Sequence, residues 1–237
     1  MKKILVCEDE DTIRDFVVIN LKRAGYEVTD VKNGDEALKV FDAEDGAFDV
    51  ALLDIMMPGT SGDAVCRILR EKSRSIGIIM LSAKAQEMDK VNCLMNGADD
   101  YITKPFSPSE LIARVDAVHR RVEFTRPLIE GAPESDITSG PFKVNAKSRL
   151  IAKSGENIDL TQVEYHILEL FIKSNNAALD RKSILRHIWG ESYFGDDKIV
   201  DVNIRRIRMK IEEDPSNPMY IQTIWGFGYK WGISNNG

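Results

Sequence analysis

The feature that most constrains the fold is a series of short predicted strands, several of which end in, or lead directly into, a carboxylate, a serine or a lysine. The spacing predicts β-strands at Lys3–Cys7, Glu27–Val31, Val50–Asp54, Gly77–Ser82 and Tyr101–Thr103, with helical patterns between them. Several of these runs are apolar throughout, which is typical of parallel strands covered on both faces. Residues 1–122 therefore predict a doubly wound α/β fold with a five-stranded parallel sheet, and ligands should bind beyond the carboxyl ends of its strands.

Carboxylates and a lysine lie at those predicted strand ends. Glu8 and Asp9 follow the first run, Asp54 ends the third, and Lys104 follows the fifth. A carboxylate can accept a phosphoryl group when a hard cation and positive donors balance the charge. Asp9 and Asp54 would ligate Mg²⁺ directly, whereas Glu8 would act through a bound water molecule. Lys104 would pair with one phosphoryl oxygen, and Ser82, which ends the fourth run, would donate its hydroxyl to another.

The C-terminal part predicts a winged helix-turn-helix. A linker over residues 123–136 contains two prolines and one glycine. Short strand patterns then occupy Phe142–Val144, Leu150–Ala152 and Asn157–Leu160. Helical patterns follow at Thr161–Ser174, Arg181–Trp189 and Ile199–Glu213, and residues 220–231 close the chain as a hairpin. We therefore expect one domain at residues 1–122 and a second at 137–237.

The last predicted helix concentrates positive charge. The whole chain carries a net charge of −6, but local charge decides contact with DNA. An apolar stripe on this helix faces the core, and Val202, Arg205 and Arg206 point most nearly away from it, flanked by Asn203 and Lys210. Arginine can pair bidentately with guanine and valine can contact a thymine methyl group. The helix therefore predicts contact with the major groove of double-stranded DNA.

Sequence motifs in both halves of the chain support these interpretations. The first half contains Glu8-Asp9-Glu10, Asp54, Met57-Pro58-Gly59 with Gly62, Leu81-Ser82-Ala83, Gly97-Ala98-Asp99-Asp100-Tyr101 and Lys104-Pro105-Phe106. The second contains Leu160-Thr161-Gln162-Val163-Glu164, Ile188-Trp189-Gly190, the run from Val200 to Arg208, Asp214-Pro215 and the run from Thr223 to Tyr229. A chain with these motifs in this order resembles the response regulators of the OmpR/PhoB family, with a receiver followed by a winged-helix effector.

The resemblance assigns roles in the pocket. It implies that a sensor histidine kinase phosphorylates Asp54, and that the backbone carbonyl of Met56 is a further Mg²⁺ ligand. It also implies that Ser82 and Tyr101 form a coupled switch and that the peptide bond between Lys104 and Pro105 is cis. Such a protein supports its own slow dephosphorylation but is not a turnover enzyme.

The resemblance also assigns DNA contacts. Val202 and Arg206 would read bases, while the mainly phosphate-contacting residues would be Lys198, Asn203, Arg205 and Arg208. The chain departs from the family at Trp225, where many members carry an arginine that enters the minor groove from the wing tip. It also carries Asn203 where histidine is frequent. RNA polymerase is a further partner that the resemblance implies.

A homodimer formed on phosphorylation is the third implication. The resemblance pairs Lys90 with Glu110, Asp100 with Arg114, and Asp99 with Arg121 across a two-fold axis. The apolar centre of this interface would be formed by Val91, Leu94 and Ala113. Two such subunits would bind paired DNA half-sites.

Two other classes of function fit the residues less well. A small α/β phosphatase needs an acid two residues after its nucleophile, where this chain has Met56, and a nucleotide-binding protein needs a glycine-rich phosphate loop. A regulator that works unphosphorylated would be expected to have a degraded acidic pocket.

The scattered cysteines (Cys7, Cys66 and Cys93) and the lack of an apolar run of ~20 residues favour a cytoplasmic protein with free thiols and no membrane contact.

Overall fold

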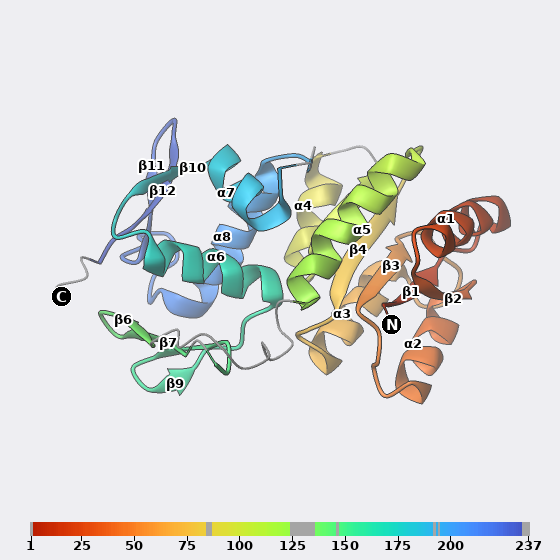
Figure 1. Ribbon diagram of the computed structural model, residues 1–237, viewed down its shortest axis with the longest axis horizontal. Helices are drawn as coiled ribbons and strands as arrows, with labels where there is room; N and C mark the ends of the chain where they lie inside the picture. Colours follow the sequence, from red (N-terminus) through yellow and green to blue (C-terminus); the bar gives the residue numbers. More distant parts are fainter. Residues whose placement is uncertain are drawn as a thin grey trace. The chain divides into compact units, whose positions relative to one another are not determined.

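The structure is a computed structural model that describes residues 2–83, 87–123, 136–145, 147–191, 193 and 195–233. The chain divides into two units, Met1–Glu123 and Phe124–Gly237. Figure 1 colours the first from red to green and the second from green to blue. No helix among the described residues has the length and apolar character needed to cross a membrane.

The sheet of the first unit has the five parallel strands that the apolar runs predict. The strands are β1 (Lys3–Cys7), β2 (Glu27–Val31), β3 (Val50–Asp54), β4 (Gly77–Ser82) and β5 (Asp100–Thr103), in the order β2-β1-β3-β4-β5. The direction of winding therefore reverses between β1 and β3. Ligands of doubly wound folds bind at the carboxyl edge of the sheet beside this reversal.

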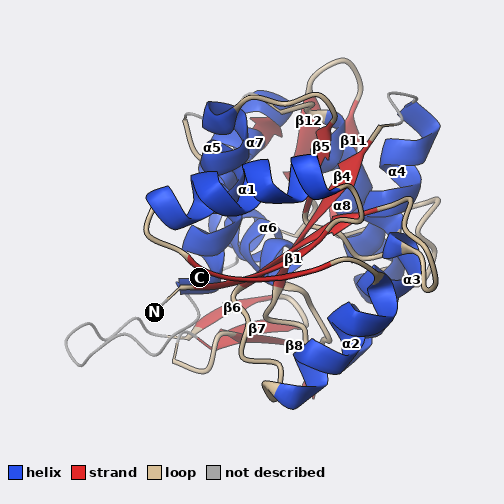
Figure 2. Cartoon of the chain, turned by 90° about the vertical axis from the view of Figure 1, so that its right-hand side faces the viewer, coloured by secondary structure: helices blue, strands red, loops and turns tan. Residues whose placement is uncertain are grey.

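Helices cover both faces of this sheet (Figure 2). They are α1 (Asp11–Arg23), α2 (Gly34–Ala43), α3 (Gly62–Lys72), α4 (Glu87–Met95) and α5 (Pro108–Glu123). Helix α1 contacts α5, and α2 contacts α3. Ser107 caps α5, because its Oγ accepts a hydrogen bond of 3.1 Å from the backbone N–H of Glu110.

The core forms where α1 and α5 pack on the sheet. Val17 and Leu21 of α1 are fully buried, together with Leu111 and Val115 of α5, against apolar side chains of β1, β3, β4 and β5. The apolar face of α1 does not extend to Ala24, which is exposed at the C-terminal cap.

The second unit has two small antiparallel sheets and three helices. Strands β6 (Ile137–Ser139), β7 (Phe142–Asn145), β8 (Leu150–Lys153) and β9 (Glu156–Asn157) form the first sheet. Helices α6 (Gln162–Lys173), α7 (Arg181–Trp189) and α8 (Lys198–Ile211) follow. The second sheet has the order β10-β12-β11, with β10 (Ala178–Asp180), β11 (Ile221–Ile224) and β12 (Gly228–Trp231). This arrangement is the predicted winged helix-turn-helix.

One short strand of this unit lies elsewhere than predicted, and two others were not predicted. The expected strand over Asn157–Leu160 ends at Asn157, because the following residues lead into the capped start of α6. Strands β6 and β10 were missed. Each has three residues, too few for a periodic pattern, and β10 is defined only by its pairing with β12.

Candidate functional site

The carboxyl ends of β1, β3, β4 and β5 bring the predicted pocket residues together. Parallel pairing of β1 with β3, β3 with β4 and β4 with β5 places these ends at one edge of the sheet. One carboxylate oxygen from each of Glu8, Asp9 and Asp54 lies within 4.8 Å of the others. The sheet therefore gathers three acidic groups whose positions in the sequence are far apart.

Lys104 joins two of these carboxylates. Its Nζ lies 2.7 Å from Asp54 Oδ2 and 2.8 Å from Glu8 Oε1. The peptide bond between Lys104 and Pro105 is cis, as expected, and the backbone N–H of Lys104 donates to the Ser82 carbonyl at 2.8 Å. One ammonium thus faces three carboxylates, which leaves the cluster with excess negative charge.

The Glu8 side chain is fully buried, so its negative charge is further destabilised by the loss of hydration. Burial raises the pKa of Glu8 to about 7, with a further contribution from Asp54, although the Lys104 ammonium acts in the opposite direction. Glu8 Oε2 lies 2.7 Å from Lys104 Nζ but accepts no hydrogen bond among the described residues. A fully buried carboxylate beside two more carboxylates, with one ammonium among them, fits a hard divalent cation such as Mg²⁺.

Asp54 is held by the loop that follows it. Its Oδ1 accepts a hydrogen bond of 3.2 Å from the backbone N–H of Met56. Gly62 packs so closely on this loop that an added Cβ would lie 1.9 Å from the backbone oxygen of Asp54. A side chain at position 62 would displace the phosphoacceptor candidate, so glycine is required there.

The two expected switch residues are both buried. Ser82 ends β4, beside the pocket, and Tyr101 lies on the neighbouring strand β5. Tyr101 is 7% exposed in this structure. In the pairing of β4 with β5, Ser82 lies opposite Thr103 and Met80 lies opposite Tyr101.

Sequence reasoning missed Arg14, which supports the acidic loop. This buried arginine donates through Nη1 to the backbone carbonyl of Glu8 at 3.0 Å, and its Nε lies 3.4 Å from Asp30. It precedes Val17 by three residues and so lies on the buried face of α1. A cation within an apolar stripe was the signal that could have revealed it.

Helix α8 presents a different face from the one predicted. Lys198 and Arg205 are exposed. Val202 and Arg206 are each only 6% exposed, so the expectation that they point away from the core is wrong. Asn203, expected to flank the outer face, is fully buried and donates through Nδ2 to the Ile199 carbonyl at 2.8 Å. The helical wheel failed because α6 packs against a second side of α8.

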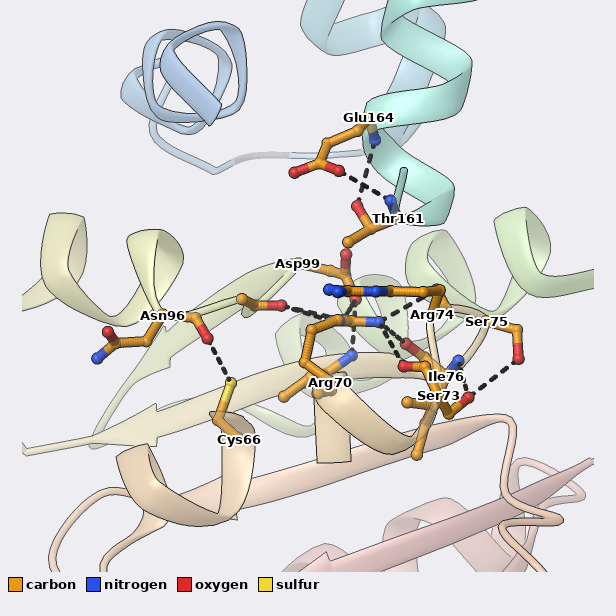
Figure 3. Close-up of polar contacts among 12 residues, drawn as sticks. Cys66, Arg70, Ser73, Arg74, Ser75, Ile76, Asn96, Asp99, Thr161 and Glu164 are labelled. Carbon is orange, nitrogen blue, oxygen red and sulfur yellow. Dashed lines mark hydrogen bonds and ion pairs between the residues drawn. The ribbon is translucent and has the colours of Figure 1, made fainter. Parts of the chain in front are cut away.

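Glu164 accounts for the position of Arg206. Its Oε1 lies 2.9 Å from Arg206 Nε, and its Oε2 lies 2.6 Å from Lys210 Nζ. The same side chain closes the capping box of α6 with Thr161 (Figure 3). Burial raises the pKa of Glu164, but the two cations outweigh it and hold the pKa below its ordinary value. A single carboxylate therefore links α6 to α8.

Acid should weaken the second unit through Glu169 of α6. Burial raises the pKa of Glu169, but hydrogen bonding to His166 and the nearby Lys173 ammonium outweigh it, giving a pKa of about 2. Because this value lies below the ordinary 4.5, the stabilisation is present above that pH and is lost as the pH falls toward 2. Urea unfolding of Glu169→Gln should show a weaker pH dependence in this window. The exposed glutamate variant Glu213→Gln should follow the wild type, and identical curves for all three proteins would contradict the assignment.

Comparison with known proteins agrees with this geometry. Residues 4–116 match the family described as the response regulator receiver domain, and residues 155–231 match the family of transcriptional regulatory proteins, C terminal. The sensory transduction protein RegX3 of Mycolicibacterium smegmatis is 41% identical over 230 residues, covering 97% of this chain and 99% of its own. The chain is a two-component response regulator of the OmpR/PhoB family.

Further relatives of this response regulator cover its full length. A probable transcriptional regulatory protein of Picosynechococcus sp. is 42% identical over 237 residues, covering 97% of this chain and 92% of its own. The response regulator DrrB, an OmpR/PhoB homologue from Thermotoga maritima, is 31% identical with a TM-score of 0.51 over 98% of this chain and 99% of that one. A RitR variant is 25% identical with a TM-score of 0.74 over the same shares. These matches support a receiver and a DNA-binding domain that acts in transcription regulation.

The acidic residues expected to form ion pairs across a response-regulator dimer interface form ion pairs within this chain instead. Asp100 is fully buried, and its Oδ1 lies 3.1 Å from Arg114 Nη1. Arg114 Nη2 lies 3.0 Å from Glu110 Oε1, one helical turn earlier. Of the expected apolar centre, Leu94 is buried, whereas Val91 and Ala113 are partly exposed. The side chains of Lys90 and Arg121 lie outside the described residues.

Asp99 departs most from its expected place at an exposed surface. It is 2% exposed, and its Oδ2 lies 2.7 Å from Arg70 Nη2 and accepts the backbone N–H of Ile78 at 2.8 Å. Arg70 also donates to the Gly97 carbonyl at 3.0 and 3.1 Å and to the Ile76 carbonyl at 2.7 Å. Figure 3 shows Arg70 at the centre of this network. Sequence reasoning missed Arg70, because only folding brings its partners together.

Proposed function

We propose that this response regulator accepts a phosphoryl group on Asp54 from a sensor histidine kinase and then binds paired DNA half-sites as a dimer. The observation that carries the proposal is the Lys104 ammonium between Asp54 and the buried Glu8, at 2.7 and 2.8 Å. A lysine in this position neutralises the acceptor before transfer and is close enough to pair with a phosphoryl oxygen afterwards.

In the transfer step, one Asp54 carboxylate oxygen forms a bond to phosphorus. The phosphorus–nitrogen bond of the phosphohistidine donor breaks, and the electron pair stays with the imidazole nitrogen, which then takes up a proton. Lys104 exchanges its contact with Asp54 for one with a phosphoryl oxygen. The Ser82 hydroxyl donates to a second oxygen, and Tyr101 occupies the buried space beside β4.

Mg²⁺ would be held by Asp9, Asp54 and the backbone carbonyl of Met56, with Glu8 acting through water. When bound, it supplies charge neutralisation for the oxygens of the transferred group. Acyl phosphate hydrolysis in the same pocket would slowly reset the protein, and this would be self-dephosphorylation rather than turnover of a substrate.

Dimerisation would exchange contacts within one chain for contacts between two. We propose that Arg114 exchanges Asp100 of its own chain for Asp100 of a second copy, and that Lys90 pairs with Glu110. Asp99 is engaged by Arg70, so a pair with Arg121 would require that contact to open first. Joining two effector domains raises their effective concentration on adjacent half-sites.

In the DNA complex, Lys198 and Arg205 of α8 are already exposed and would contact phosphates. Base reading by Val202 and Arg206 would require both side chains to emerge from their buried positions. Bound in this way, the protein would act on transcription through RNA polymerase.

Incubation with acetyl phosphate and Mg²⁺, followed by intact mass measurement, tests the acceptor. Wild type should gain one phosphoryl group and then elute as a dimer from gel filtration. Asp54→Asn, which keeps the shape of the side chain, should gain no mass and should remain in its original elution position. A mass gain or a phosphate-driven dimer in Asp54→Asn would contradict the proposal, and an Asp63→Asn variant provides a control outside the pocket.

A further inference from the structure

The loop between β3 and α3 carries part of the proposed Mg²⁺ site. Asp54 ends β3, and Met56, whose backbone carbonyl is the proposed third ligand, lies on the loop itself. Contacts within the loop fix its base, because the Met56 N–H donates to Asp54 Oδ1 and the Gly62 N–H donates to the Ile55 carbonyl, both at 3.2 Å. The direction of the Met56 carbonyl therefore also depends on what holds the outer part of the loop.

The start of helix α2 packs on that outer part. The Thr60 hydroxyl of the loop donates a hydrogen bond to Asp35 Oδ1 in the first turn of α2. Gly59 has φ +75°, and a Cβ at this position would lie 2.6 Å from Asp35 Oδ2. A Cβ on Gly34 would lie 2.0 Å from the backbone oxygen of Thr60. The loop and the first turn of α2 are thus in close contact, and Asp35 with Thr60 provides a side-chain link between them.

Asp35 is not needed to cap α2. Acidic residues in the first turn of a helix commonly interact with the exposed N–H groups there. In α2 this role belongs to Asn33, whose Oδ1 accepts the backbone N–H of Glu36 at 2.9 Å. Glu36 completes the cap, because its Oε2 accepts the backbone N–H of Lys32 at 3.3 Å. The Asp35 carboxylate is directed instead to the loop that follows the phosphoacceptor candidate.

We infer that Asp35 is a positioning residue for the Mg²⁺ site, and that it acts through Thr60 by holding the β3–α3 loop in its ion-binding conformation. This inference rests on the proposed function, in which Asp54 and the Met56 carbonyl ligate Mg²⁺. A ligand that is already in place loses little conformational freedom when the ion binds. Without the link, ordering of the loop would oppose binding, and the affinity for Mg²⁺ would fall.

Titration calorimetry of the full-length, unphosphorylated protein with MgCl₂ tests this role. Thr60→Val keeps the shape of the side chain but lacks the hydroxyl, so its Kd for Mg²⁺ should rise about 5-fold, the effect of losing one hydrogen bond of ordinary net strength. Thr60→Ser keeps the hydroxyl and should bind Mg²⁺ like wild type. Asp35→Ala should match Thr60→Val, and the two changes combined should weaken binding no further than either alone.

The negative charge of Asp35 needs a separate control, because any carboxylate near the pocket attracts a cation. Asp35→Asn removes the charge but keeps an oxygen that can accept the Thr60 hydroxyl, so it should bind Mg²⁺ like wild type. Weaker binding in Asp35→Asn together with wild-type binding in Thr60→Val would mean that Asp35 acts by charge alone, and would overturn the inference.

Phosphorylation by acetyl phosphate, followed by intact mass, provides a second readout. Thr60→Val should need about 5-fold more Mg²⁺ to reach half of its maximal rate, in line with its Kd, and should reach the wild-type rate at saturating Mg²⁺. A lower maximal rate with an unchanged Kd for Mg²⁺ would contradict positioning of the ion site. Wild-type protein that neither binds Mg²⁺ nor gains a phosphoryl group would instead overturn the proposed function, and both are measured before any variant.

Discussion

Replacing Lys104 with methionine is expected to lower the free energy of unfolding by about 3 kcal/mol at pH 8 in the presence of a chelator. The Lys104 side chain is 13% exposed, and its ammonium compensates Glu8 and Asp54, which are almost fully buried. Without it, two carboxylates face each other with no cation between them. The loss should appear as a lower urea midpoint with an unchanged slope.

The pH dependence of this loss identifies its cause. Glu8 has a pKa of about 7 beside Lys104, and because the ammonium lowers this pKa, it should be higher in the methionine variant. A carboxyl group with a raised pKa destabilises the fold when it must be ionised, so the extra cost in the variant should shrink as the pH falls from 8 toward 7 and should be small below 7. Mg²⁺ should stabilise the variant more than it stabilises wild type, because it replaces the missing positive charge.

Lys104→Arg is the matched control for this experiment, since it keeps a cation in the pocket. It should lose less stability than Lys104→Met and should respond less to Mg²⁺. An equal loss for Lys104→Met at pH 8 and pH 5.5 would mean that side-chain packing, rather than charge, is what Lys104 contributes.

Replacing Arg70 with methionine should cost about 4 kcal/mol, the second large effect. The side chain is buried and bonds to Asp99 and to backbone carbonyls after α3 and α4. Its removal leaves a buried carboxylate without a cation, because Asp99 keeps only the backbone N–H of Ile78. Asp99 Oδ1 already has no hydrogen-bond partner among the described residues. The measurement is urea unfolding at pH 7.

Asp99→Asn provides the second arm of a double-mutant cycle. The amide oxygen can still accept the backbone N–H of Ile78, but the buried negative charge is gone. Arg70→Met combined with Asp99→Asn should therefore be more stable than Arg70→Met alone. Simple addition of the two single effects would show that Arg70 stabilises the loops through backbone contacts only, and that Asp99 is not its charge partner.

The acidic pocket could be predicted from the sequence because parallel strands impose its geometry. Strand ends at Glu8, Asp54 and Ser82 must meet at one edge of a parallel sheet, whatever the helices do. Local chemistry likewise predicted the three effector helices, because turns and caps depend on neighbours in the chain. Short strands such as β10 were not predicted, because three residues are too few to show a hydrophobic period and only the pairing with β12 defines the strand.

The orientation of charged side chains was decided by tertiary packing. A helical wheel assumes one buried face, but α8 is covered on two sides, so Arg206 turns to Glu164 and Asn203 is buried. Asp99 and Arg70 are separated by 28 intervening residues, and no periodicity could have paired them.

The sequence by itself therefore determined the class of fold, the order of the helices and of the longer strands, and the residues of the acidic pocket, because each follows from local pattern and strand direction. Tertiary structure alone decided which charges are neutralised within the chain and which remain available to partners. The physical reason is that burial and ion pairing depend on what packs from elsewhere in the chain, as Arg70 does on Asp99 and Arg208 on the wing.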